Sequence, residues 1–516
     1  MSAMLRKRPL NRLAKTSHPV LYEVNTGVLL NELSREEGKR ITLATVPDRV
    51  LDEWAALGFD AIWLMGVWTT GPLGLEIARD HPGLQEEYHR ALPDYTPGDI
   101  AGSPFAVSAY EVSEHLGGKK ALQVLRERMA DRSMGVVLDF ICNHTARDHE
   151  WVTTHPEYYV QGEPGDQEKY ADRYFAAKTS RGEKILAFGR DPTYPAWTDT
   201  AQMNHTNADM RRALIDELKK VASQCDGVRC DMAMLVLKDV FARTWGDRVR
   251  SSSDPLPDRE FWDEAIRTVR KDSPSFVFIA EAYWNLEWEL QQLGFNYTYD
   301  KRLYDRLLRE GASSVRDHLK AELDFQLRSV RFIENHDEDR AAHALQSESW
   351  HYAAAVIAAT TPGMFLVHEG QMEGRAVKLP VQLARRQDEP VSARTISFYR
   401  QLLSCLSQPI FQKGIWHLLD PRPSWHDNLT WQNFLVFWWG EESNSARLVV
   451  VNYAPHSGQC YVDIPTESIE GNSIDFRDLM GTASYVREKA GLMAKGMYFD
   501  LPGYGLHIFD IKPGRK

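Results

Sequence analysis

The stretch GVVLDFICNH, residues 135–144, decides the fold of this chain. It begins as a continuous apolar run rich in β-branched residues, which is typical of a strand buried on both faces. Asp139 then places a carboxylate near the carboxyl end of that strand, although burying an unpaired carboxylate costs several kcal/mol. In a parallel barrel, strand ends open on the face where chemistry occurs. The stretch therefore predicts a barrel strand that carries functional groups at its end.

Three further segments repeat this arrangement of an apolar run that closes with carboxylates. They are GVRCDM (227–232), FVFIAEAYW (276–284) and SVRFIENHDED (329–339). Their carboxylates include Asp231, Glu281 and Asp337. Because all strands of a parallel barrel end on one face, we expect the four segments to form a single active site.

Eight strand-like runs alternate with amphipathic helical patterns along the chain. The other four are VLYEVNTG near residue 20, FDAIWLMG near 59, FNYTYD near 295 and GMFLVHEG near 363, of which FNYTYD is the weakest. This alternation predicts an α/β fold of the (β/α)8 TIM-barrel type rather than an open doubly wound sheet.

Two segments between strands are much longer than the usual βα loop of about 2–6 residues. The second of them, residues 145–203, is rich in aromatic residues, Asp and Gly, and predicts a small inserted domain after the third strand. Alternating runs such as NFLVFWWG then predict a C-terminal antiparallel β-sandwich domain. We expect an N-terminal tail (1–18), a catalytic barrel (19–144 and 204–404), an inserted domain (145–203) and a C-terminal β domain (405–516), with a further long loop over about 67–105.

Composition and charge argue against several classes of protein. A chain of 516 residues with 43% hydrophobic and 26% charged residues is ordinary for a globular protein. The net charge of -11 opposes generic binding to nucleic acid or to an anionic membrane. Five cysteines without metal-binding spacing, and a basic N-terminus without an apolar core segment, predict a cytoplasmic protein.

Together these segments resemble the α-amylase superfamily, glycoside hydrolase family 13. The four regions of that family resemble residues 139–144, 227–231, 280–281 and 332–337 of this chain. WTDTAQMN (197–204) is similar to the motif that ends the family's inserted domain, and HEGQMEG (368–374) to the segment after the eighth strand. Each motif alone is weak, but four in order at barrel spacing are specific.

The resemblance implies a retaining hydrolase that cleaves α-glucosidic bonds by double displacement. Asp231 would be the nucleophile, Glu281 the general acid and base, and Asp337 a third carboxylate that binds sugar hydroxyls. Retention needs the first two carboxyl groups about 5–5.5 Å apart, and the acid needs a pKa raised by burial and a neighbouring negative charge. The substrate-binding residues implied are Asp139, His144, Arg229, His336 and Phe105, although Asp139 could instead support the site by bonding to its neighbours. Arg229, two residues before Asp231, points to the same strand face and can keep it ionised.

Asn143 matches a position that ligates calcium in many amylases, through a side-chain oxygen that suits a hard cation. The sequence shows no recognisable Asp cluster beside it, so calcium is an open expectation. The resemblance implies no organic cofactor, and the partner that it implies is a small α-glucoside or oligosaccharide.

Two departures from the family pattern favour a small substrate. Residues 232–235, MAML, stand where endo-acting amylases have Lys-His, and Phe105 replaces a Tyr that often stacks on the sugar ring. Both favour an enzyme that resembles exo-acting α-glucosidases, although residues 232–235 could simply pack the helix after the strand. Two alternatives stay open: a transglucosidase that uses the same carboxylates, and a barrel that binds sugar without catalysis.

Overall fold

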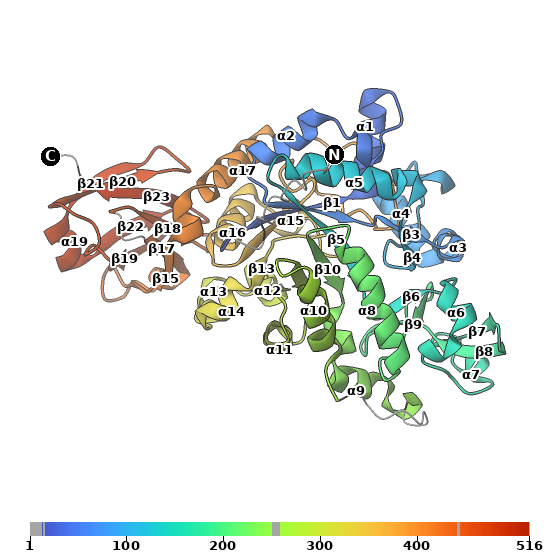
Figure 1. The fold of residues 1–516 in the computed structure, drawn as a ribbon. Coiled ribbons are helices and arrows are strands. Elements are labelled where there is room, and N and C mark those ends of the chain that lie inside the picture. The colour runs from blue at the N-terminus through green and yellow to red at the C-terminus, as the bar shows by residue number, and fades with distance from the viewer. Residues whose placement is uncertain (1–12, 14–15, 250–257, 441–443, 515–516) are drawn as a thin grey trace, which may run out of the picture.

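Eight parallel strands close into a barrel at the centre of the molecule (Figure 1). The computed structural model describes residues 13, 16–249, 258–440 and 444–514, so most of the expected tail over residues 1–18 lies outside the described residues. In order around the barrel the strands are β1 (Val20–Asn25), β2 (Ala61–Met65), β5 (Gly135–Ile141), β10 (Gly227–Asp231), β11 (Val277–Ala280), β12 (Tyr297–Tyr299), β13 (Ser329–Arg331) and β14 (Met364–His368). The predicted (β/α)8 barrel is confirmed, and FNYTYD contributes the short strand β12.

Helices surround these strands and follow the amphipathic patterns of the sequence (Figure 1). They are α1 (Thr26–Glu37), α2 (Asp48–Ala56), α5 (Gly118–Ala130), α8 (Ala208–Ala222), α9 (Lys238–Val249), α10 (Phe261–Asp272), α11 (Glu287–Gln292), α12 (Lys301–Arg309), α13 (Ala312–His318), α14 (Leu323–Leu327), α15 (Ala341–Ala344), α16 (Glu348–Thr360) and α17 (Ala393–Leu406). Among the described residues, no helix combines the length and the apolar character needed to cross a membrane.

The barrel strands are buried on both faces, which explains their continuous apolar runs. All seven residues of β5 are buried, and its alternate residues face two different cores. Val137 joins the cluster inside the barrel, whereas Val136 and Leu138 join the cluster under the helices. By the same alternation, Asp139 shares the inward face with Val137, and Glu281 shares it with Ile279. The barrel interior thus delivers carboxylates to its carboxyl end.

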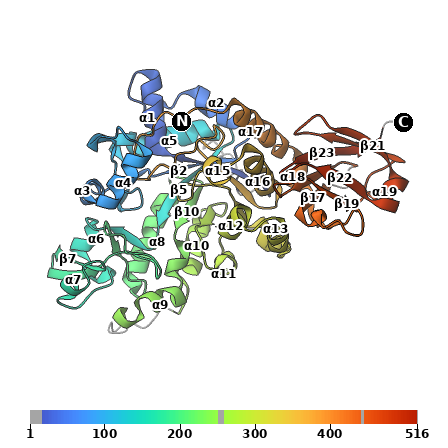
Figure 2. The ribbon, with the colours of Figure 1, turned by 180° about the vertical axis from the view of Figure 1, so that it is seen from behind.

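Two excursions from the barrel lie beside its mouth. The first contains β3 (Trp68–Thr70), α3 (Pro72–Asp80), α4 (Pro82–Ala91) and β4 (Val107–Val112). The second is the inserted domain, with β6 (His144–Ala146), α6 (Glu150–Thr154), α7 (Asp166–Lys169), β7 (Tyr174–Thr179), β8 (Gly182–Ala187) and β9 (Thr200–Gln202). Because β6 pairs with β9, the insertion leaves and rejoins the barrel at one place. Figure 2 shows it at the opposite end of the molecule from the C-terminal domain.

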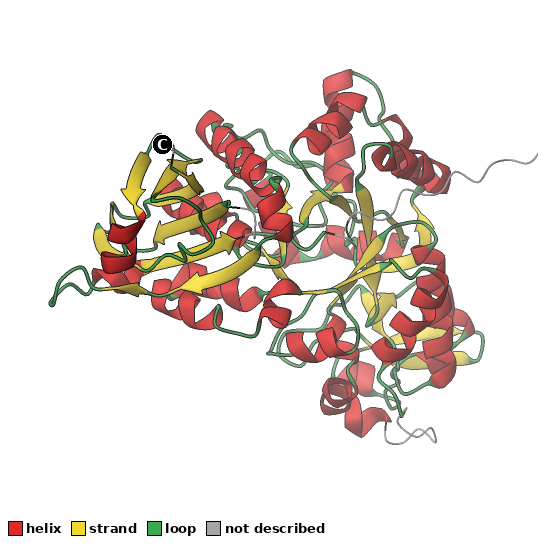
Figure 3. Cartoon of the chain, turned by 60° about the vertical axis from the view of Figure 1, so that its left-hand side comes forward, coloured by secondary structure: helices red, strands yellow, loops and turns green. Residues whose placement is uncertain are grey.

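The C-terminal domain is a sandwich of two antiparallel sheets, set apart from the helix-ringed barrel in Figure 3. Its elements are α18 (Pro409–Lys413), β15 (Ile415–Leu419), β16 (Pro421–Arg422), β17 (Phe434–Gly440), β18 (Ala446–Asn452), β19 (Gly458–Val462), β20 (Ser473–Asp478), β21 (Ser484–Glu488), α19 (Lys489–Lys495), β22 (Met497–Leu501) and β23 (Leu506–Pro513). Strand β17 joins the two domains because it packs against both of their cores. Phe434, Val436 and Trp438 fill the space between the sheets, whereas the residues between them pack toward the barrel.

Helix α16 is the barrel element that receives this packing. Every residue from His351 to Thr360 is buried, unlike the half-exposed helices around the rest of the barrel. Trp439 of β17 donates its indole N–H to the carbonyl of Thr360, at 2.8 Å. A helix that is apolar on all sides must be covered on all sides, so its Ala-rich sequence reflects a position between two domains.

Gly363 supplies a test of how tightly the barrel closes. It precedes β14 with φ of +112°, and an added Cβ would lie 2.3 Å from the carbonyl oxygen of Ser329 in β13. We expect Gly363→Ala to destabilise the protein by about 1–3 kcal/mol beyond the backbone strain alone, because β13 and β14 must separate. The control is Gly182→Ala, which shares the positive φ but meets nothing within 4 Å. Equal thermal unfolding midpoints for the two variants would contradict this expectation.

Candidate active site

Strands β10 and β11 set two carboxylates side by side. The strands pair in parallel, with Arg229 opposite Ile279 and Cys230 opposite Ala280. The ladder continues past β11, because the Glu281 N–H donates to the carbonyl of Cys230 at 3.0 Å. Asp231 and Glu281 therefore emerge from adjacent strands at the same end of the barrel.

The guanidinium of Arg229 holds both carboxylates. Its Nη1 donates to Asp231 Oδ1 and its Nη2 to Glu281 Oε2, each at 2.6 Å. The Arg229 side chain is only 1% exposed, so both bonds lie away from water and are charge-assisted. The predicted contact with Asp231 is present, and the bond to Glu281 is an addition that the sequence did not indicate. One cation thus fixes the two groups expected to carry the chemistry.

Glu281 has the environment that a general acid needs. Burial raises its pKa; Arg229 opposes this, the charges of Asp231 and Asp337 add to it, and the resulting pKa is about 7. Its Oε2 also accepts the N–H of Met232 at 2.7 Å, whereas Oε1 accepts the hydroxyl of Tyr283 at 2.7 Å. Oε2 is therefore engaged by the protein, and Oε1 is the oxygen available to carry a proton.

Asp337 lies nearer to solvent than the other two carboxylates. Its side chain is 44% exposed, against 8% for Asp231 and 4% for Glu281. Partial desolvation would raise the pKa of Asp337, but His336 and Arg229 lower it well below the usual value. Asp337 is therefore ionised across the physiological range, as a group that binds hydroxyls and stabilises positive charge should be.

His336 joins Asp337 to the inner wall of the barrel. Its Nε2 lies 3.0 Å from Asp337 Oδ2, and its Nδ1 lies 2.5 Å from Oε1 of Glu23, a fully buried residue of β1. Burial lowers the pKa of His336, but the charges of Asp337 and Glu23 outweigh it and raise the pKa to about 10. His336 is thus an imidazolium held between two carboxylates.

Sequence reasoning missed Glu23 and left Tyr283 as an unassigned aromatic. A signal for Glu23 was present, because VLYEVN places a carboxylate inside an otherwise apolar buried strand. Tyr283 had a weaker signal, its position two residues after Glu281. Neither signal identified the hydrogen-bond partner. Glu23 pairs with His336, which is distant in the sequence, and the contact of Tyr283 with Glu281 depends on how the chain turns after β11.

Phe105 and Asp139 surround Arg229 in different ways. The Phe105 ring centroid lies 5.2 Å from the Arg229 guanidinium and 5.3 Å from the His336 ring, so this aromatic face reaches the site as predicted. The oxygens of Asp139 accept the indole N–H of Trp63 and the N–H of Gly66, at 3.0 and 2.9 Å. Burial raises the pKa of Asp139 to about 6, although Arg229 lowers it. Both oxygens of Asp139 are thus engaged by the protein, and its contact with a substrate stays a prediction.

His144 lies where the inserted domain meets the barrel. Its ring is buried and lies 5.1 Å from the ring of Trp197. Burial lowers the pKa of His144, although the charge of Asp231 raises it, so the ring is neutral near pH 7. A neutral imidazole retains one N–H donor for a sugar hydroxyl.

Asn143 is paired with an amide of the inserted domain. Its Oδ1 and its main-chain oxygen both accept from Gln202 Nε2 at 2.9 Å, and its Nδ2 donates to Gln202 Oε1 at 3.2 Å. Within the described part of the chain, no cluster of three or more His, Cys, Asp or Glu side chains is placed to hold a metal ion. The residue expected to ligate calcium thus has an amide partner, and calcium at this position stays a prediction. The pair ties β9 of the inserted domain to the loop after β5.

Residues 232–235 pack into the protein. Ala233–Val236 form a short 3-10 helix, and all four of its residues are buried. Met232 adopts φ of +44°, a strained conformation that directs its N–H to Glu281. The packing alternative left open for this segment is therefore the one observed.

Comparison with known proteins identifies the relatives of this fold and sequence. Residues 49–389 match the family model described as alpha amylase, catalytic domain. The alpha-amylase MalA of Haloarcula japonica is 25% identical over 377 residues, which cover 72% of this chain and 46% of that protein. An alpha-1,4-glucan:maltose-1-phosphate maltosyltransferase of Rhodospirillum rubrum is 27% identical over 345 residues, 65% of this chain and 42% of its own. The chain spans less than half the length of both relatives.

Solved structures share the whole architecture. The maltogenic alpha-amylase AmyB of Thermotoga neapolitana superposes with a TM-score of 0.65 at 18% identity, covering 96% of this chain and 99% of that chain. The alpha-amylase GTA of Geobacillus thermoleovorans, solved with acarbose, gives 0.64 at 16% identity, covering 97% and 100%. At this level of identity the likeness shows the fold alone, and the roles of individual residues stay predictions.

The charge on His336 can be tested by removing its buried partner. In the wild-type protein we expect the imidazolium to persist above pH 9, because its pKa is about 10. Glu23→Gln deletes a carboxylate that raises this pKa, so the proton should be lost at a pH lower by about one unit or more. Titration of ¹³C-labelled histidine by NMR measures this, with the resonance assigned by its absence in His336→Asn. Glu53→Gln, at a half-exposed carboxylate, is the control; an unchanged midpoint in Glu23→Gln would contradict the contact.

The amide pair at Asn143 predicts tolerance of chelators. We expect EDTA to leave both the activity and the thermal midpoint unchanged. Gln202→Ala should lower the midpoint, since an unpaired buried amide costs about 1–3 kcal/mol. The matched control is Gln161→Ala, in the same domain but exposed, whose side chain donates only to the carbonyl of Pro156. Loss of activity in EDTA that calcium restores would refute this reading.

Proposed function

The chain belongs to the α-amylase family, and on that premise we propose that it is a retaining glycoside hydrolase of short α-glucosides. The observation that carries the proposal is the clamp of Arg229 on Asp231 and Glu281. It places the Asp231 carboxylate beside a carboxyl group, that of Glu281, whose pKa is raised to about 7. Double displacement needs this combination of a nucleophile and an acid.

The oxygens of Asp231 and Glu281 have separate roles in the proposed reaction. Arg229 occupies Oδ1 of Asp231, which leaves Oδ2 to attack the anomeric carbon. Glu281 protonates the leaving oxygen from Oε1, where the Tyr283 hydroxyl lies. In the second step the Glu281 carboxylate takes a proton from water, and this water releases the sugar from Asp231. Carboxylates carry every step, so the reaction needs no organic cofactor.

Other groups at the site would hold the sugar ring. Asp337, held in place by the His336 imidazolium, provides a charged acceptor for hydroxyls. Phe105 offers an aromatic face above Arg229, and His144 offers one N–H from the opposite loop. These four residues come from three separate segments, as expected for a site built on a barrel.

Enclosure of the nucleophile and acid favours a short substrate. Asp231 and Glu281 are nearly inaccessible, whereas Asp337 is half-exposed, so entry from the Asp337 side is favoured. Residues 232–235 are directed into the core and supply no polar side chains for a long acceptor chain. We therefore favour oligosaccharides of a few units or small glucosides, and five cysteines, all unpaired and buried, support a cytoplasmic setting.

Transglucosidation is the second candidate, and Trp284 favours it. This residue follows Glu281 by three positions, its side chain is 43% exposed, and it and Asn285 both have positive φ. Two successive strained residues that hold an aromatic ring outward can form a stacking platform for an acceptor sugar. An acceptor held there would compete with water for the glycosyl-enzyme.

Product analysis distinguishes these functions. The purified protein is incubated with maltose, sucrose, trehalose and maltoheptaose, and free glucose is measured against transfer products. Hydrolysis of short glucosides predicts glucose as the main product and slow cleavage of maltoheptaose. Dominant transfer products would favour the transglucosidase, and binding without turnover of any substrate would reject both.

Glu281→Gln should reduce kcat by about 10²–10⁴-fold with folding intact, because the proton donor is lost. For the wild-type protein, kcat/KM should fall as pH rises through about 7, since the acid works only while protonated and its pKa is raised to that value. Glu289→Gln, at an exposed carboxylate of α11, is the control. Near-normal turnover in Glu281→Gln would refute the assigned role.

A further inference from the structure

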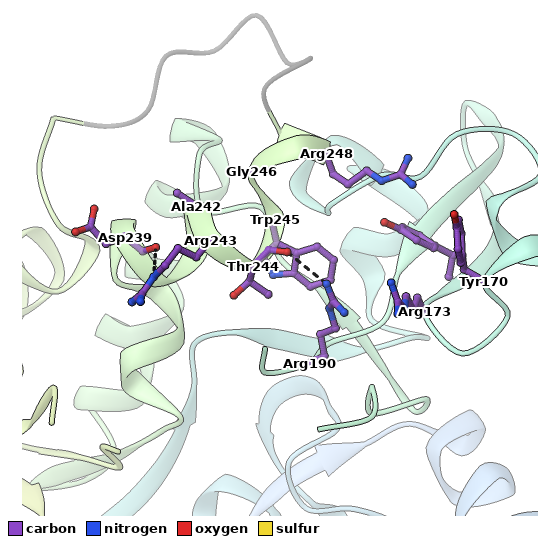
Figure 4. Close-up of a pocket in the computed structure, with 11 residues that line it drawn as sticks. Tyr170, Arg173, Arg190, Asp239, Ala242, Arg243, Thr244, Trp245, Gly246 and Arg248 are labelled. Carbon is purple, nitrogen blue, oxygen red and sulfur yellow. Dashed lines mark hydrogen bonds between the residues drawn. The ribbon is translucent and has the colours of Figure 1, made fainter. Parts of the chain in front are cut away.

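An open cavity of about 780 Å³ lies between the inserted domain and helix α9. The inserted domain contributes Tyr170, Arg173, Tyr174 and Arg190, and α9 contributes Asp239, Ala242, Arg243, Thr244, Trp245, Gly246 and Arg248. In Figure 4 the Arg190 side chain lies against the Trp245 ring, with Arg243 on one side and Arg173 on the other. The volume is in the usual range for a small-molecule site.

The cavity is strongly basic in a chain that is acidic overall. Among the residues that the structure describes, four arginines and one acidic residue, Asp239, line it, whereas the whole chain carries a net charge of -11. A concave surface lined by one sign of charge concentrates counter-ions of the opposite sign. The cavity therefore attracts anions, unlike the active site, whose substrate is proposed to be neutral.

Two of the four arginines have carboxylate partners. Arg248 Nη1 lies 2.8 Å from Asp166 Oδ2, and Arg173 lies 3.8 Å from Asp172. For Arg190 and Arg243, the described residues provide main-chain oxygens and no ion pair: Arg190 donates to the carbonyl of Thr244 at 3.3 Å, and Arg243 to that of Asp239 at 3.2 Å. Two guanidinium groups thus keep most of their donors for a ligand.

Arg190 has a buried donor that the described residues leave unused. Its Nε is buried without a hydrogen-bond partner in the described part of the protein, and its guanidinium lies 4.7 Å from the centroid of the Trp245 ring. Burial lowers the pKa of Arg190, and the charge of Arg173 lowers it further. A bound anion would offset both effects.

The walls between the arginines are aromatic. Tyr170, Tyr174 and Trp245 present rings to the same cavity, and the apolar faces of sugar rings pack on such rings. Guanidinium groups recognise phosphate through paired N–H donors. We propose that this cavity is a second binding site, separate from the catalytic carboxylates, for a saccharide that carries a phosphate group.

The cavity and the active site share a short segment of chain. Arg190 follows Gly189, where an added Cβ would lie 3.0 Å from Cβ of His144. The Arg190 N–H also donates to Oε1 of Gln202, at 3.4 Å, so the arginine is anchored to the amide pair of the inserted domain. A ligand on Arg190 therefore binds to a segment that packs directly on an active-site residue.

Calorimetric titration tests the site with glucose 6-phosphate as the probe, and with glucose, inorganic phosphate and AMP as comparisons. We expect saturable binding of glucose 6-phosphate at least tenfold tighter than binding of glucose, with competition by inorganic phosphate. Arg243→Gln and Arg190→Gln should each weaken it about tenfold, since each removes a charged donor. Arg267→Gln is the charge-matched control, because this exposed arginine of α10 pairs with Asp263 elsewhere on the surface. Asp231→Asn should leave binding unchanged.

Four results would overturn the proposal. The first is no saturable binding of glucose 6-phosphate up to about 10 mM, a concentration well above the dissociation constants of specific sites. The second is equal loss in Arg243→Gln and Arg267→Gln, which would indicate a nonspecific charge effect. The third is loss in Asp231→Asn, which would place the ligand in the active site. The fourth is tighter binding of AMP than of glucose 6-phosphate, which would reject the saccharide.

Discussion

The rest of the site depends on one buried interaction, the bidentate hold of Arg229 on Asp231 and Glu281. A buried guanidinium is stable only when its charge is compensated, and two carboxylates on adjacent strands provide that compensation. Conversely, the carboxylates tolerate burial because the cation lies between them. The barrel makes this arrangement available, since β10 and β11 run in parallel and end at the same edge. Fold and chemistry therefore support each other at a single residue.

The balance of positive and negative groups explains why neighbouring carboxyl groups have different pKa values. Five carboxyl groups, those of Asp139, Asp231, Glu281, Asp337 and Glu23, face fewer cations: Arg229, the imidazolium of His336 and Lys378. The cations cannot neutralise all five, so burial raises the pKa of Glu281 and of Asp139 while His336 keeps the pKa of Asp337 low. An acid, Glu281, and an ionised stabiliser, Asp337, arise in this way from the same functional group, a carboxyl. The surplus of negative charge is thus part of the proposed chemistry.

The inserted domain joins the site through neutral contacts. The amide pair of Asn143 and Gln202 attaches β9 to the barrel loop, and the same Gln202 accepts the N–H of Arg190. Beyond this anchor the charge changes sign, and arginines line the cavity facing α9. Gln202 of β9 therefore bonds both to Asn143, next to the barrel that carries the acidic catalytic centre, and to Arg190, which lines the basic cavity.

The sequence by itself determined the eight strands, their order and the four carboxylate-bearing ends, because continuous burial leaves a local apolar pattern. It also indicated that Arg229 and Asp231 share a face, since alternation in a strand is local. Tertiary structure alone decided the partners. Glu23 hydrogen-bonds to His336, which lies 313 positions away in the sequence, and Tyr283 donates a hydrogen bond to Glu281. Trp63 donates to Asp139, and Gln202 pairs with Asn143. It also directed residues 232–235 into the core and brought the arginines of two domains together. A hydrogen-bond partner depends on how distant segments pack, and no local pattern records that.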